Sequence, residues 1–443
     1  MAGSWRAHGW ALAALGAPAM TVILEIFRAP SEELGMTWSV AIMAIAAAAT
    51  VLAERAARHD GEDRFRVSIA ALAAMSMIAL GLFVSFSDGA LSLALAVLVL
   101  AAVALDDRFN LPSMSPFVQI GVAVLIYRAV TYPNMGMLID GPFWEFAFGF
   151  FPAIALLAAA WLLSHKSKRV LMHTVIEGGL LVITGIMITI AITRMSVSMM
   201  DGLQNAHWLL GLVASTWLVI AGASLRNVGV ARRSIAREDR SRLRYIVPQV
   251  ARYTSAGFAL LLAFGLILVG LTIANPLFGG ISGSRVTGTI LLNTLLMSYL
   301  LPALILGFGA LRVPGLHRIL RYAGLAVAGL LGLHWAILTV AHAWRGPDLP
   351  AVPMGAGELW TYTAMLLLIG TVLMVGSLWK GSKPMRMVAN GFLVLAIGKV
   401  FLVDAPDLDG LIRAGSFLIL GLCLAGLAWV NRLAMVSTPT GGE

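Results

Sequence analysis

The chain has 443 residues, of which 59% are hydrophobic and only 12% are charged, and its mean hydropathy is +0.89. Soluble globular proteins carry about 25% charged residues, so this composition excludes a protein whose whole surface faces water. The net charge of +9 does not indicate nucleic-acid binding, because the basic residues lie in short loops between apolar runs and form no basic soluble domain.

Fourteen apolar runs have about the length that a membrane-spanning helix needs. The first run follows Arg6 and continues to Phe27 without a clear cleavage site, so it predicts a membrane helix rather than a signal peptide. The expected fold is an all-α polytopic membrane helix bundle. The expected spans are 10–27, 36–53, 67–87, 89–105, 116–132, 143–163, 170–193, 207–225, 253–273, 286–311, 318–342, 358–379, 385–403 and 413–431.

The distribution of basic residues predicts how these spans are oriented. The two termini and the loops after even-numbered spans hold 24 of the 31 Lys and Arg residues, and the loops after odd-numbered spans hold 5. Basic residues collect on the cytoplasmic side of membrane proteins, so we expect both termini in the cytoplasm. The expected location is the bacterial cytoplasmic (inner) membrane.

The longest of the basic loops is 226–252, which holds eight Lys and Arg residues. One interpretation is an orientation signal that lies against anionic headgroups of the lipid bilayer. The other is a docking site for a soluble protein partner. The single cysteine, Cys423, cannot form an internal disulfide or a cysteine metal cluster, and we expect no metal site and no cofactor.

A weak similarity recurs every four helices. Pro-Ala stands in mid-span at Pro152 and again at Pro302, 150 residues later. Because four is even, successive units have the same orientation, which predicts a parallel repeat. We therefore expect one membrane domain with a partial unit at 10–66 and full units at 67–169, 170–317 and 318–433.

Two segments resemble a known bacterial family. The stretch from Ala396 to Leu422, which includes the sequence GKVFLVDAPDLDG, resembles the hallmark of the domain-of-unknown-function family 2339. The segment from Asn275 to Pro302 resembles a second signature of that family. The resemblance implies a large polytopic membrane protein, and because family members are about twice as long, it implies that this chain corresponds to their C-terminal half. It implies no activity.

Ionisable residues inside a membrane are costly and are candidate functional groups. Arg128 and Lys399 both fall in the outer third of their expected spans. One interpretation is that they pair with carboxylates near the outer boundary, among them Glu358, and lock the helix ends. The other is a polar cluster in the outer leaflet that binds an anionic ligand. Its candidate residues are Arg128, Glu145, Lys399, Asp404 and Arg413.

A second candidate site lies near the start of the span 170–193. His173 and Glu177 are four residues apart, so they share one face of the helix. They form a candidate proton or ion relay. The alternative is a buried Glu177 that is neutral or paired with a loop arginine.

These features favour three classes of function. The spans, the repeat and the intramembrane charges indicate a transport or lipid- or solute-handling protein of the cell envelope. The basic loop and the small number of such charges fit a non-catalytic scaffold or assembly subunit. A membrane enzyme acting at the outer face has support only from Lys399, Asp404 and Arg413. No catalytic set of residues is identified, so an enzyme is the least favoured class.

Overall fold

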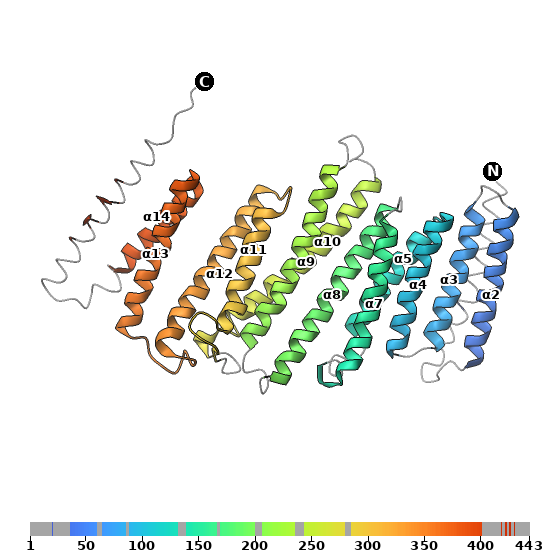
Figure 1. The fold of residues 1–443 in the computed structure, drawn as a ribbon, viewed down its shortest axis with the longest axis horizontal. Coiled ribbons are helices and arrows are strands. Elements are labelled where there is room, and N and C mark those ends of the chain that lie inside the picture. Colours follow the sequence, from blue (N-terminus) through green and yellow to red (C-terminus); the bar gives the residue numbers. More distant parts are fainter. Residues whose placement is uncertain are drawn as a thin grey trace, which may run out of the picture. The chain divides into compact units, whose positions relative to one another are not determined.

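A computed structural model describes the chain over residues 36–59, 64–85, 88–131, 139–165, 169–199, 206–234, 243–279 and 285–400, and at a few positions elsewhere. All the long elements in these ranges are helices (Figure 1). They are α2 (Met36–His59), α3 (Arg64–Ser85), α4 (Asp88–Phe109), α5 (Met114–Thr131), α7 (Phe143–Ser164), α8 (Val170–Met199), α9 (Ala206–Ser234), α10 (Leu243–Leu271), α11 (Leu301–Arg312), α12 (Arg318–Arg345), α13 (Ala356–Lys380) and α14 (Lys383–Lys399).

Ten of these helices are long and apolar enough to cross a membrane, and the shorter helix Leu296–Arg312 is also apolar. With α14, helices therefore occupy twelve of the fourteen expected positions within the described residues. The first expected span, 10–27, and the last, 413–431, lie outside the described residues apart from single positions. The all-helical polytopic membrane architecture is confirmed, whereas the count of fourteen and the four-helix repeat stay predictions.

The largest departure from the expected spans is at 286–311. The helix here begins only at Leu296, because the residues before it form a tight turn. Thr294 N donates to Thr287 O at 3.0 Å, and Thr289 N donates to Leu292 O at 3.0 Å. Gly288 occupies the turn with φ of +109°, a conformation that L side chains rarely adopt.

The helix that follows this turn starts with a π-helical segment, Leu296–Leu300, before α11. Pro302 explains the change, because proline has no N–H to donate to the carbonyl four residues earlier. The buried side chain of Tyr299 in this segment donates its hydroxyl to Gly270 O of α10 at 2.7 Å. The segment is thereby fixed to a neighbouring helix.

Contacts divide the described chain into two compact units. Unit 1 comprises the described residues up to Ala274 together with 297–332, and unit 2 comprises 275–296 and the described residues from Leu333 onwards. In unit 1, α2 packs on α3, α4 on α5 and α7, α8 on α5, α7, α9 and α10, and α9 on α10 and α11. In unit 2, α13 packs on α14.

Close packing in unit 1 depends on small residues. A Cβ added to Gly211 of α9 would lie 2.3 Å from Ser298 Cα, and one added to Gly229 would lie 2.1 Å from Pro314 O. Such approaches of one backbone to another are typical of membrane helix packing. They hold α9 against both ends of the 296–312 helix.

Candidate functional site

The predicted pair His173 and Glu177 lies in the first two turns of α8, and α9 and α10 complete its surroundings in unit 1. The carboxylate of Glu177 accepts hydrogen bonds on both oxygens: Asn227 Nδ2 of α9 donates to one, and Arg252 Nη2 of α10 donates to the other at 3.1 Å. The side chains of Arg252 and Glu177 are only 12% and 13% exposed. Glu177 is thus a largely buried carboxylate within a candidate membrane span, and it is paired with Arg252.

A small cavity with several polar lining residues adjoins this ion pair. Its volume is about 20 Å³, and its lining includes Glu177, Arg252, Thr174, Ser224 and Ser255. Two donors in its wall, Arg252 Nε and Ser255 Oγ, are buried and make no hydrogen bond within the described part of the chain. A cavity of this size holds about one water molecule when it offers several polar partners. The cavity can therefore hold one water molecule beside Glu177, and the carboxylate of Glu177 can accept a proton.

His173 extends the polar site towards the helix ends. Its Nδ1 lies 2.8 Å from Ser164 Oγ of α7, and its ring stacks on Trp161 with centroids 5.8 Å apart. The ring of His165, whose residue is exposed, lies edge-on to His173 at 5.4 Å. His165, His173 and Glu177, which can each carry a proton, therefore follow one another from the exposed ends of the helices to one face of α8.

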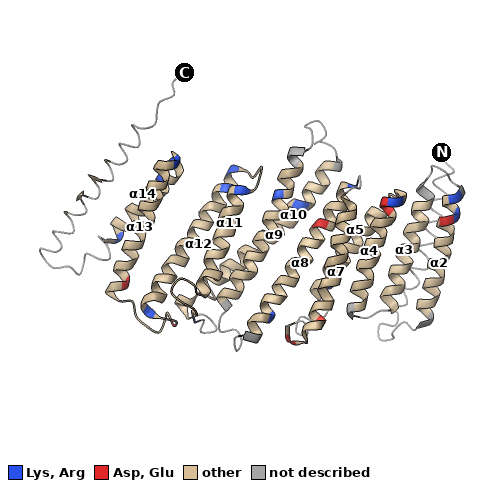
Figure 2. Ribbon diagram, viewed as in Figure 1, with Lys and Arg blue, Asp and Glu red and all other residues tan. Residues whose placement is uncertain are grey.

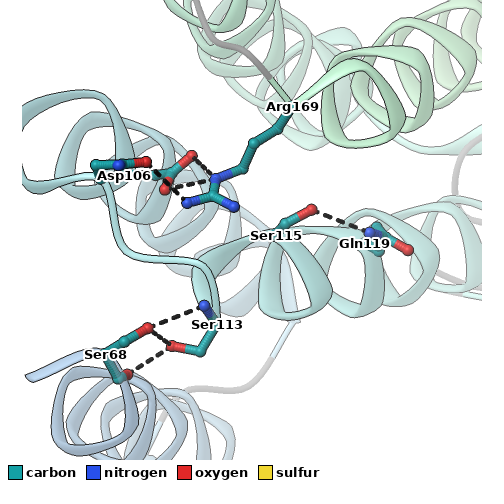
Figure 3. Close-up of polar contacts among 7 residues, drawn as sticks. Ser68, Asp106, Ser113, Ser115, Gln119 and Arg169 are labelled. Carbon is teal, nitrogen blue, oxygen red and sulfur yellow. Dashed lines mark hydrogen bonds and ion pairs between the residues drawn. The ribbon is translucent and has the colours of Figure 1, made fainter. Parts of the chain in front are cut away.

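The start of α8 is also tied to α4. Arg169 Nε lies 2.8 and 2.6 Å from the two carboxylate oxygens of Asp106, and Arg169 Nη2 donates to Asn110 Oδ1 at 3.1 Å. Figure 3 shows this contact beside the hydrogen bonds between Ser68 and Ser113. Because Asp106 is buried, this ion pair fixes the residue just before α8 to the end of α4.

The candidate outer-leaflet cluster is divided between the two units. Arg128 of α5 lies in unit 1, and its Nε donates to Ser92 Oγ of α4 at 3.1 Å. Glu145 lies half-buried in the first turn of α7. Lys399 lies at the end of α14 in unit 2, whereas Asp404 and Arg413 lie outside the described residues. The cluster of five residues therefore stays a prediction.

A groove of about 490 Å³ lies near Glu145. Its described lining comes from the start of α7, the residues just before it, and the end of α8. Asp140 and Arg194 are its charged lining residues, and Arg194 also donates to Gly141 O. Neither Arg128 nor Glu145 is part of that lining.

Lys399 donates hydrogen bonds to α13. Its Nζ lies 2.7 Å from both Leu359 O and Thr363 Oγ1. Glu358, which the sequence suggested as a partner for the intramembrane cations, instead pairs with Arg345 of α12 at 2.8 Å on both oxygens. Tyr362 adds a third hydrogen bond to Glu358 at 2.7 Å.

Sequence reasoning missed two partners in these sites. Asn227 and Arg345 each belong to a different helix from the acidic residue that they contact. The position of Arg345 was a usable signal, because it ends one helix and Glu358 begins the next across a short loop. For Asn227 no comparable signal exists, because its role depends on how α8 packs on α9.

Comparison with family models gives a match over residues 1–434 to a family described as "Predicted membrane protein (DUF2339)". The match extends to the N-terminal residues that precede the two resembling segments. No curated protein and no solved structure shows significant similarity to the chain.

Proposed function

This chain belongs to the DUF2339 family of predicted membrane proteins, and we propose that it is a transport protein of the bacterial cytoplasmic membrane. In this proposal Glu177 takes up and releases a proton, and this step is coupled to the movement of a solute or lipid. Both termini lie in the cytoplasm, so the polar site of α8 opens towards the cytoplasm.

The observation that carries the proposal is the buried carboxylate of Glu177 between two donors and a polar cavity. An ionisable group inside a membrane is costly, and proton relays of transporters use such groups. Purely structural ion pairs need no adjoining cavity with buried donors. Here Arg252 Nε and Ser255 Oγ lie in the cavity wall without a hydrogen bond among the described residues.

The geometry gives the proton step a structural consequence. A proton that reaches Glu177 from the side of His165 and His173 binds a carboxylate oxygen and neutralises the charge. The ion pair with Arg252 is then lost, which leaves a buried cation without its partner and strongly destabilises that arrangement. The contact between α8 and α10 is therefore the element that protonation would switch.

A charge-displacement experiment tests this proposal. The purified chain is reconstituted in liposomes, adsorbed on a solid-supported membrane, and exposed to a jump from neutral to acidic pH. We expect a transient current as protons bind, and we expect Glu177→Gln to abolish it. Glu54→Gln is the matched control, because Glu54 lies on α2 in an exposed i,i+4 pair with Arg58.

Either of two results would contradict the proton site. One is a current in Glu177→Gln that equals the current of the unsubstituted chain. The other is no current above that of protein-free liposomes in the unsubstituted chain. Circular dichroism and gel filtration establish that the variants compared are folded.

A scaffold or assembly subunit is the second candidate function. One observation favours it: α9 continues as a helix to Ser234, past the apolar part of its sequence and into the basic segment 226–252. A basic helix that projects beyond the bilayer is suited to an acidic face of a protein partner. Stoichiometric copurification that is lost when Arg226, Arg232 and Arg233 are replaced by Gln would support this function.

A further inference from the structure

The four helices α9 to α12 enclose an apolar pocket within unit 1. Its volume is about 170 Å³, and every residue of its lining is apolar or glycine. At roughly 30 Å³ for a group of the size of water, it has room for about five or six such groups. Apolar cavities of this kind stay dry and take apolar ligands.

Glycines keep this pocket open. Gly222 of α9 and Gly309 of α11 both line it, and a Cβ added at either position would meet nothing within 4 Å. Gly324 of α12 also lines it, at the point where α12 passes close to Ala310. The open space therefore depends on the missing side chains at Gly222 and Gly309, whereas Gly324 permits the close approach of α12 to Ala310.

The pocket lies close to one end of the helices. Its lining on α12 runs from Leu320 to Val327, and α12 begins at Arg318. At 1.5 Å per residue, these positions are about 3 to 14 Å from the start of the helix. That depth corresponds to the upper part of the acyl chains in one leaflet, next to the headgroups.

Arginines stand at this end of the same helices. Arg226 follows the lining residue Leu225, and Arg321 follows Leu320. Arg312 precedes Val313 and lies over the ring of Phe308 at 5.2 Å. Figure 2 shows the blue basic residues at these ends of α9 to α12.

Arg321 has a buried donor at this end of α12. Its Nε is buried and makes no hydrogen bond within the described residues, and it stands one helical turn before the lining residue Gly324. Guanidinium groups bind phosphate oxygens through paired N–H donors. Basic pockets between membrane helices on the cytoplasmic side bind anionic headgroups.

We infer that the α9–α12 pocket is a binding site for one anionic phospholipid of the leaflet at this end of the bundle. One acyl chain enters the apolar pocket between Gly222, Gly309 and Gly324. The phosphate lies against Arg321, with Arg226 and Arg312 at the rim. This site does not depend on the proton step at Glu177.

Native mass spectrometry of the purified full chain tests the site. The protein is delipidated in detergent and titrated with phosphatidylglycerol or with phosphatidylcholine of the same acyl chains. We expect one phosphatidylglycerol to bind tightly and phosphatidylcholine to bind weakly. Arg321→Gln should weaken phosphatidylglycerol binding by about tenfold, because a charge-assisted hydrogen bond to the phosphate is lost.

Filling the pocket provides a second, independent variant. Gly222→Leu places a side chain in open space, so we expect the protein to fold and to lose the bound lipid. Gly329→Leu is the matched control, because Gly329 is exposed on α12 and has equal room for a Cβ. Arg108→Gln on α4 is the corresponding control for the lost charge.

The possible results separate the alternatives. Lipid binding by Gly222→Leu at the level of the unsubstituted chain would overturn the acyl-chain site. Equal binding of phosphatidylcholine, or displacement of the lipid by inorganic phosphate alone, would overturn the proposed occupant. If circular dichroism shows that Gly222→Leu does not fold, the lipid affinities of Arg321→Gln and Arg108→Gln test the site instead. Equal affinities in these two variants would overturn the proposal.

Discussion

Glu358 and Arg345 form the most deeply buried ion pair of unit 2 among those described. Their side chains are 1% and 10% exposed, and the carboxylate also accepts a hydrogen bond from Tyr362. Glu358 stands in the first turn of α13, where the helix dipole also favours a negative charge. The pair therefore stabilises the connection between α12 and α13 only while both charges are present.

Glu358→Gln keeps the shape of the side chain and removes its charge. We expect the free energy of unfolding to fall by about 3 to 5 kcal/mol, because a buried cation is left without its partner. Glu54→Gln, in the exposed pair with Arg58, should change it by about 0 to 1 kcal/mol. Unfolding by sodium dodecyl sulfate in mixed micelles measures both, and equal loss in the two variants would contradict the buried-pair argument.

At this scale the sequence identified charged residues but not their partners. Glu177 was recognisable because a carboxylate inside an apolar run is rare, and a loop arginine was one of its expected partners. In the structure its partner is Arg252, at the end of the expected loop 226–252. The pairing of Glu358 with Arg345 was not among the expected pairs, although Arg345 ends the helix before the one in which Glu358 stands.

The turn before α11 is the element for which the sequence was most misleading. Ile290, Leu291 and Leu292 are as apolar as a membrane helix, yet they form the tip of the turn and are 55%, 64% and 74% exposed. Hydropathy alone cannot separate an apolar turn from the end of a helix. The threonines and the glycine around the tip favour the turn, because they provide its hydrogen bonds and its positive φ.

The helix that follows the turn is short, and its length explains why the tip of the turn is apolar and exposed. The 17 residues of Leu296–Arg312 are about 25 Å long, which is less than the roughly 30 Å of the hydrocarbon core. We therefore expect the tip at Leu291 to enter the edge of the bilayer and to supply the missing apolar length.

A nitroxide spin label at Leu291→Cys, in a chain with Cys423→Ser, measures this insertion. We expect the label to be more accessible to oxygen than to a water-soluble nickel chelate, because interfacial apolar groups lie about 5 to 10 Å below the surface. A label at Ala351→Cys, in the exposed loop before α13, should show the opposite order. A nickel-accessible label at Leu291 would contradict the insertion.

For the whole molecule, the composition and the lengths of the apolar runs were sufficient to predict the class of fold. Apolar runs of span length became helices at twelve positions, including the two short runs at α4 and α5. The sequence did not predict the division into two units, because that division depends on tertiary contacts such as those of residues 275–296 with the loop after α12. Val286 N, for example, donates to Pro347 O at 2.8 Å.

The distribution of basic residues among the loops also predicts the orientation of the helices in the membrane. Single-cysteine labelling measures that orientation. In a Cys423→Ser chain, we expect Ala351→Cys to react with a membrane-impermeant maleimide in intact cells. His317→Cys, in the loop between α11 and α12, should react only after the membrane is permeabilised, because loops rich in basic residues are expected on the cytoplasmic side. Ser4→Cys and Ser437→Cys extend the measurement to both ends of the chain. Fourteen crossings require these two to behave like His317→Cys, whereas an odd number of crossings would leave one end reactive in intact cells.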